Sequence, residues 1–242
     1  MIYVFHYFYL SLNNKTSFAI LLPLRNLSLK EEYRSDRENL IEEFFLPCLD
    51  NCIEYDRAVE YASINSLTSY YFGLKSFLDN NVYLRFVIGH RLRTSDLNIL
   101  VSIFRKKNGI LSFKPNSEQK KHISILEQMF ETNNIKLKIA IPNSEEVYGT
   151  FNEKIGIFHD ENDDAVAFTG TSNETFDPEK RNFESIDVFT SWNDKSRVDI
   201  KIDDFENLWQ NKIKTVSVYD LEYAIQNNLL SYSTEWALET HN

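Results

Sequence analysis

Three short segments of the sequence carry side chains that could take part in chemistry. Asn152 and Lys154 are two positions apart, so on an extended strand both point to the same face. Further along come Gly170-Thr171-Ser172-Asn173 and then Glu184. A lysine ammonium, a threonine hydroxyl and an asparagine amide all donate hydrogen bonds, and such donors suit an anion. Each residue alone would more often be a surface residue, but the ordered series favours one shared site.

The ordered block from Phe151 to Trp192 resembles the phospholipase D superfamily. The family pattern is His-x-Lys on one strand, Gly-Ser-x-Asn after the next strand, and an acidic residue downstream. The matching stretches here read Asn152-Glu153-Lys154, Gly170-Thr171-Ser172-Asn173 and Asn182-Phe183-Glu184. The block is most similar to phospholipase D-like domains of the nuclease type, which accompany bacterial helicases and restriction-type nucleases that act in phage defence. Including its weaker upstream part, the similarity covers about Ser28 to Trp209.

The resemblance implies a role for each residue of this block. Lys154 would neutralise phosphoryl oxygens, and Gly170 would let the backbone approach a phosphate. Thr171 and Asn173 would donate hydrogen bonds to the same oxygens, and Glu184 would orient the histidine of the motif. The implied reaction is hydrolysis of a nucleic-acid phosphodiester through a phosphohistidine. It needs neither a metal nor another cofactor, so none is expected.

Position 152, where the family has its nucleophilic histidine, is an asparagine. The lone pair of an amide nitrogen is delocalised into the carbonyl group, so it cannot attack phosphorus or shuttle a proton. Loss of a covalent nucleophile costs on the order of 10⁴ to 10⁶ in rate, so the chain as written is expected to be inactive or strongly impaired. Two departures are milder. Thr171 stands for serine, and the aspartate expected five residues after the lysine falls on His159, with Asp160 one place later.

No other histidine is expected to replace the missing one. His159 has the opposite strand parity from the motif and should face away from it. His90 follows a predicted central strand, which places it nearer to a site of this kind. His6, His122 and His241 are expected at surface or capping positions.

The number of motifs in the chain bears on its assembly. The family's complete site uses two motifs related by a two-fold axis, and this chain has one, so a homodimer is expected. Three hypotheses stay open: a nuclease, a catalytically silent module that binds nucleic acid or a helicase or nuclease partner, and a purely structural assembly module. A histidine at position 152 of a parent sequence would favour the first, and a natural asparagine the second. The nucleic acid implied is DNA, and no membrane partner is expected.

The charge balance is acidic, with 26 lysines and arginines against 36 aspartates and glutamates, a formal net charge of −10. Such a chain is not an obvious nonspecific nucleic-acid binder, although a local basic groove is compatible with it. The candidate cations are Arg91, Arg93, Arg105-Lys106-Lys107, Lys120-Lys121 and Lys180-Arg181.

The two cysteines, Cys48 and Cys52, lie four apart in a predicted helix. No His or Cys cluster accompanies them, so buried apolar positions are favoured over a metal site. A reducing cytoplasm is the natural setting for such a chain.

Hydrophobic periodicity predicts alternating helices and strands. Helices are expected over 35–53 with a break at Pro47, over 66–78, 94–104, 116–131 and 196–212, and from Asp220. Strands are expected over 57–63, 82–88, 135–141, 149–158, 165–169, 184–191 and 215–219. Asn162-Asp163-Asp164 predicts a hairpin turn. The pattern indicates an α/β fold with a mixed central sheet and helices on both faces.

The expected domain organisation has three parts. Residues 1–27 are an N-terminal strand or extension, whose first apolar stretch is too short to span a bilayer and lacks the basic start of a signal peptide. Residues 28–212 form the phospholipase D-like domain. Residues 213–242 add a strand and a helix that pack on the same domain.

Overall fold

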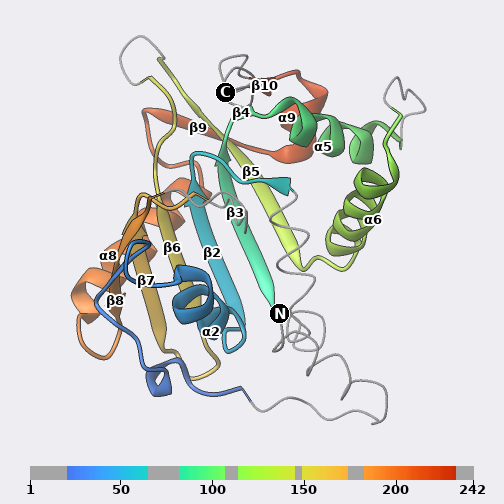
Figure 1. Ribbon diagram of the computed structural model, residues 1–242. Helices are drawn as coiled ribbons and strands as arrows, with labels where there is room; N and C mark the ends of the chain where they lie inside the picture. Colours follow the sequence, from blue (N-terminus) through green and yellow to red (C-terminus); the bar gives the residue numbers. More distant parts are fainter. Residues whose placement is uncertain (1–20, 65–81, 107–113, 145–148, 174–182, 233–242) are drawn as a thin grey trace, which may run out of the picture.

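A computed structural model describes residues 21–64, 82–106, 114–144, 149–173 and 183–232. Within these ranges the chain forms an eight-stranded mixed sheet with helices on both faces (Figure 1). The strand order is β1-β8-β7-β6-β2-β3-β5-β9. The pairs β2/β3 and β3/β5 are parallel, and the other neighbouring strands of the sheet are antiparallel. The predicted α/β class with a mixed central sheet is confirmed.

The strands of this sheet are β1 (Glu32–Arg34), β2 (Glu54–Val59), β3 (Tyr83–Gly89), β5 (Ile135–Pro142), β6 (Ile155–His159), β7 (Ala165–Gly170), β8 (Ser185–Thr190) and β9 (Val216–Asp220). A separate parallel pair joins β4 (Arg91–Leu92) and β10 (Ser231–Tyr232). The helices are the 3-10 helix η1 (Leu24–Asn26), the π-helix η2 (Ile41–Phe45), α2 (Leu46–Leu49), α5 (Thr94–Lys106), α6 (Ser117–Glu131), α8 (Lys195–Trp209) and α9 (Leu221–Gln226).

Each face of the sheet has its own apolar core. On one face, α8 packs over β6, β7 and β8 with Val198, Phe205 and Leu208 turned inward. The opposite face is covered by η2, α2, α5, α6 and α9. There the rings of Phe44 and Phe168 meet edge to face, with centroids 5.2 Å apart. Alternate residues along each strand therefore enter different cores, which fixes the face of every side chain on the sheet.

Several boundaries differ from the predictions. The predicted helix over 35–53 is helical only from Ile41 to Leu49, and Cys48 and Cys52 are both buried and free, as expected of apolar positions. The predicted strand over 149–158 begins only at Ile155. The last paired residue of β2 facing β6 is Ala58, opposite Ile155, so the residues before 155 have no strand partner on that side. The predicted helix over 66–78 lies outside the described residues.

The predicted hairpin turn joins β6 to β7. Asp163 has a φ of 61°, the left-handed conformation that Asp tolerates in turns. The Asp160 carboxylate accepts the backbone N–H groups of Asn162 at 2.8 Å and Asp164 at 3.0 Å. Its second oxygen accepts the N–H of Leu24 at 2.8 Å. Asp160 thus has a structural role, holding both the turn and the segment that contains η1.

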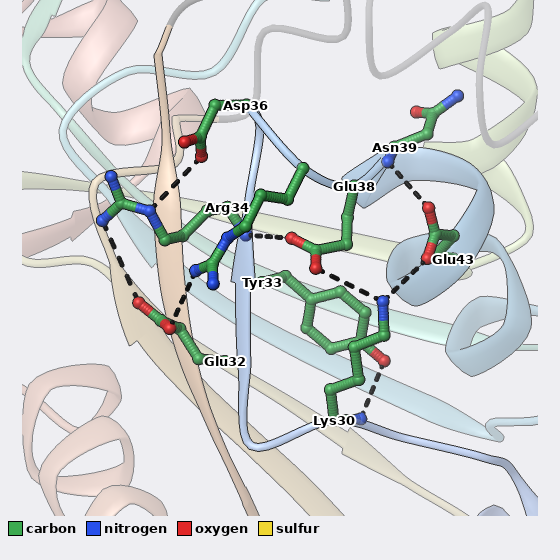
Figure 2. Close-up of polar contacts among 9 residues, drawn as sticks. Lys30, Glu32, Tyr33, Arg34, Asp36, Glu38, Asn39 and Glu43 are labelled. Atoms are coloured by element: carbon green, nitrogen blue, oxygen red, sulfur yellow. Dashed lines mark hydrogen bonds and ion pairs between the residues drawn. The ribbon is translucent and has the colours of Figure 1, made fainter.

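The edge strand β1 is held in place by a charged network on the surface (Figure 2). Arg34 lies between Glu32 and Asp36, with 3.3 Å from its Nε to the Asp36 carboxylate. Lys30 joins Glu38 and Glu43 at 3.4 and 3.1 Å. The hydrogen bond from the Arg34 backbone N–H, followed by Lys30, lowers the pKa of the Glu38 carboxyl. These exposed pairs fix the path of the chain around β1 and contribute little energy individually.

A second ionic cluster lies on the α8 face, beneath β2 and β3. Arg85 contacts Asp56 at 2.6 Å, Glu54 at 2.8 Å and Glu206 of α8 at 2.6 Å. Burial raises the pKa of the Glu54 carboxyl, and the nearby Asp56 raises it further. These contacts explain why β2 carries charged residues in a sheet interior, a feature that hid part of the strand from the hydrophobic pattern.

Candidate functional site

The ends of four neighbouring strands meet at one edge of the sheet. They are the carboxyl ends of β2 and β7 and the amino ends of β6 and β8. Ile155 of β6 faces the α8 core, so Lys154, one residue earlier, has the parity of the opposite face. The ladder pairs Ile155 with Thr169, which brings Lys154 beside Gly170 of the neighbouring strand. Segments that are distant in sequence are thereby adjacent at this edge.

The Lys154 ammonium lies between two oxygen acceptors. Its Nζ is 3.5 Å from Oε2 of Glu60, the residue that follows β2. It also donates a hydrogen bond to the side-chain carbonyl oxygen of Asn152. The Lys154 side chain is 13% exposed, and the Glu60 side chain is 31% exposed. The ammonium is therefore largely shielded from bulk water, although the neighbouring Asn152 is exposed.

Asn152, which stands where the resemblance implies a histidine, is exposed and lies just before β6. Its carbonyl oxygen is used by Lys154, which leaves its amide group as a hydrogen-bond donor. The arrangement holds an ammonium and an amide next to each other. It can bind negative charge, and position 152 supplies no group that can attack phosphorus.

Gly170 and Thr171 connect β7 to the start of β8. A Cβ on Gly170 would lie 2.1 Å from the carbonyl oxygen of Ser185, so only glycine permits this approach of the two strands. The Thr171 hydroxyl accepts the Ser185 backbone N–H at 3.0 Å and lies 3.4 Å from the Ser185 carbonyl oxygen. In this structure both residues therefore serve the β7–β8 junction, a role that the sequence analysis did not assign to them.

Arg57 is a site residue that the sequence analysis missed. It is fully buried on β2, opposite Gly156, on the same face as Lys154. Its Nη2 donates to the carbonyl oxygen of Ser172 at 2.5 Å, and its guanidinium lies 4.9 Å from the Phe168 ring centroid. The signal available in the sequence was an arginine within a predicted strand. It positions the backbone just before Asn173.

Asn173 follows directly, and its Oδ1 is buried with no hydrogen-bond partner among the described residues. Such an acceptor normally finds a donor, so the hydrogen-bonding capacity of this amide is incompletely used among the described residues. The Ser172 side chain is buried, whereas Thr171 is exposed, so the chain turns inward over these three residues.

Glu184 lies at the start of β8, where the edge strand anchors it. Its backbone N–H donates to the Ser35 hydroxyl at 2.9 Å, and its carbonyl accepts the Ser35 N–H at 2.9 Å. Ser35 follows β1, so the network of Figure 2 supports this position. Glu184 has the parity of Ile186, which packs in the same core as Phe168.

The histidines are distributed as follows. His159 lies at the other end of β6, with its Nε2 3.4 Å from Asp56 in the α8-face cluster. His90 is buried directly after β3. His122 was expected at the surface, but it is buried on α6, because it shares the inward stripe of that helix with Leu126 and Met129. His6 and His241 lie outside the described residues.

The candidate basic residues do not form one described groove. Arg91 and Arg93 are exposed after β3, and the Arg93 guanidinium lies 5.1 Å from the Tyr61 ring centroid. Lys120 and Lys121 are exposed on α6, which packs beside β5, with β2 and β3 between it and β6. The side chains of residues 105–107 and the pair 180–181 lie outside the described part.

Comparisons with known proteins give a limited result. No family model matches the chain, and no curated protein matches it. A solved structure of NucT from Helicobacter pylori is similar over 78% of this chain and 97% of that chain, with 11% sequence identity and a TM-score of 0.47. Likeness at this level transfers no residue's role. Within the described ranges, no three His, Cys, Asp or Glu residues gather as metal ligands, and no helix is long and apolar enough to cross a membrane.

Proposed function

We propose that this chain is a phospholipase D-like domain of the nuclease type that binds a nucleic-acid phosphodiester at the sheet edge around Lys154. The observation that carries the proposal is the strand register, which brings Lys154 beside Gly170 and the segment that leads to Asn173. The shielded ammonium is the main attraction for a phosphoryl oxygen, because its charge is screened less than that of a surface lysine. The amide group of Asn152, whose carbonyl oxygen accepts from Lys154, adds a donor beside it, and we expect the amide of Asn173 to add another.

The chemistry proposed for a competent version of the site has two steps. A histidine at position 152 would attack phosphorus, expel one alcohol of the diester, and form a phosphohistidine. Water would then attack that phosphorus and release the phosphorylated product and the imidazole. Lys154 would offset the charge that develops on the nonbridging oxygens, and Glu184 would orient the ring. With Asn152 in place, the first step has no nucleophile.

The second candidate function is a catalytically silent module that binds nucleic acid or a helicase or nuclease partner. It is favoured by the contact between Asn152 and Lys154, because the asparagine is hydrogen-bonded into the site. In either case we propose a homodimer that brings two Lys154 sets to one two-fold axis, with DNA as the ligand. Sedimentation over a concentration series, with and without phosphate, tests this assembly. A strict monomer under both conditions would contradict it.

A nuclease assay that compares the chain with its Asn152→His variant tests the catalytic proposal. Both proteins are incubated with single- and double-stranded DNA and with RNA, in the presence of a chelator. The unaltered chain should show little or no cleavage, and the variant should gain chelator-resistant activity. An Asn152→Ala variant is the matched control. Strong chelator-resistant cleavage by the unaltered chain, retained in the alanine variant, would show that position 152 does not govern turnover.

A further inference from the structure

A carboxylate stands next to the proposed anion site. Glu60 Oε2 lies 3.5 Å from Lys154 Nζ, so a phosphoryl oxygen that reaches this ammonium also enters the field of Glu60. The backbone of Glu60 is held at the end of β2. Its carbonyl accepts the Gly89 N–H at 3.1 Å, and a Cβ at Gly89 would lie 2.6 Å from that oxygen. The side chain of Glu60 therefore starts from a fixed point of the backbone next to the site.

We propose that Glu60 is a specificity-determining residue, which shifts the Lys154 site toward a singly charged phosphodiester and away from a doubly charged phosphate monoester. The inference rests on the proposed function, in which Lys154 binds the phosphoryl group. A diester carries one negative charge, and a monoester carries nearly two above its second pKa of about 6. Both Coulomb terms grow with the charge of the ligand, so Lys154 alone would bind the monoester more tightly than the diester, and Glu60 opposes that difference. Glu60 thus shifts the site toward internal linkages of a nucleic-acid chain and away from its phosphorylated ends.

The charges around Lys154 support this assignment. Among the described residues, Glu60 is the carboxylate that forms an ion pair with Lys154. Its side chain is 31% exposed, so solvent screens its charge only in part. Glu153 is also adjacent to Lys154 in sequence, but it is exposed, and its contact is with the Lys154 backbone N–H at 3.2 Å. The two glutamates differ in which part of Lys154 they contact. Glu153 therefore provides a matched control for removing one negative charge.

The test uses thymidine 5′-monophosphate and its methyl ester, two ligands that differ by one methyl group and one charge at about pH 8. Calorimetric or NMR titration gives the ratio of their affinities for the full chain and for Glu60→Gln, Glu60→Asp and Glu153→Gln. Glu60→Gln should shift this ratio toward the monophosphate by about three- to tenfold at low salt, relative to the unaltered chain. Glu60→Asp and Glu153→Gln should largely keep the ratio of the unaltered chain.

The salt dependence gives a second measurement. The shift caused by Glu60→Gln should shrink as the salt concentration rises from about 20 to 200 mM, because a charge-based effect is screened. If binding depends on Lys154 but the ratio of the two affinities is the same in the unaltered chain and in Glu60→Gln, the role of Glu60 is overturned and the proposed function stands. Binding that survives Lys154→Ala, or no binding of either ligand, would overturn both.

Discussion

Replacing Lys154 with alanine is expected to weaken the binding of a short oligonucleotide by about ten- to hundredfold at low salt. The Lys154 side chain is 13% exposed, so its charge acts on a bound phosphate with less solvent screening than a surface lysine. A charge-assisted hydrogen bond to a phosphate contributes about 1.5–3 kcal/mol to binding, and the variant loses it. In addition, Glu60 without its partner Lys154 repels the phosphate, which weakens binding further.

The salt dependence of binding separates this charge from a structural effect. A single phosphate contact contributes about 0.7 to 0.9 to the slope of log K against log salt. Removing the Lys154 contact should therefore make the slope shallower by about 0.7 to 0.9 for each protomer bound. Between about 50 and 200 mM salt, the affinity difference between the two proteins should therefore shrink about three- to fourfold. Fluorescence anisotropy with a labelled oligonucleotide measures both quantities.

Lys195→Ala is the matched control for this experiment. Lys195 lies on α8, on the other face of the sheet, and its side chain is 73% exposed and paired with Asp199 at 2.7 Å. Its removal changes the net charge by the same amount but should leave the affinity within about twofold. If Lys154→Ala and Lys195→Ala give the same affinity and the same salt slope, Lys154 does not contact phosphate.

Three further predictions concern stability. Gly156→Ala should destabilise the chain by about 1–3 kcal/mol in denaturant unfolding, because its Cβ would lie 2.1 Å from the Phe168 ring. Arg57→Met should lower the free energy of unfolding by no more than about 1–3 kcal/mol, because removal of a buried charge offsets the lost hydrogen bond to Ser172. The same variant should weaken oligonucleotide binding. The hydrogen bond from Arg25 at 2.6 Å lowers the pKa of Asp164 in the folded chain. The contribution of this pair to the free energy of unfolding is therefore complete above the unfolded pKa of about 3.9, and it is lost as pH falls through the pKa of the folded chain. Acid titration of Asp164→Asn should lack this contribution.

The sequence predicted the sheet well where strands are apolar and regular. β3, β5, β7 and β9 lie within one or two residues of their predicted bounds, and the hairpin turn is correct. The short strands β1, β4 and β10 were missed, because two or three residues are too few to show a period. β2 was placed three residues late, since Glu54 and Asp56 face Arg85 and break the apolar pattern that marks a buried strand.

The candidate site was predictable only along single segments. Spacing two residues apart gives Asn152 and Lys154 a common face, and the structure joins them by a hydrogen bond. The pairing of Lys154 with Glu60 spans 94 positions in the sequence, and it depends on the antiparallel register of β2 and β6. No local pattern encodes such a contact. The same holds for Arg57, whose bond to Ser172 reaches from β2 past β6 to the end of β7.

Asn152, Lys154 and Glu60 form one unit, and this affects any attempt to restore a nucleophile. The ammonium has two oxygen acceptors, and Asn152→His removes one of them, because a neutral imidazole offers a single acceptor nitrogen in a different place. Lys154 would then rely more on Glu60, which competes with the phosphoryl group for the same charge. Combining Asn152→His with Glu60→Gln should therefore change diester binding by more than the product of the single effects. A strictly additive double-mutant cycle would show that the two residues act on Lys154 independently.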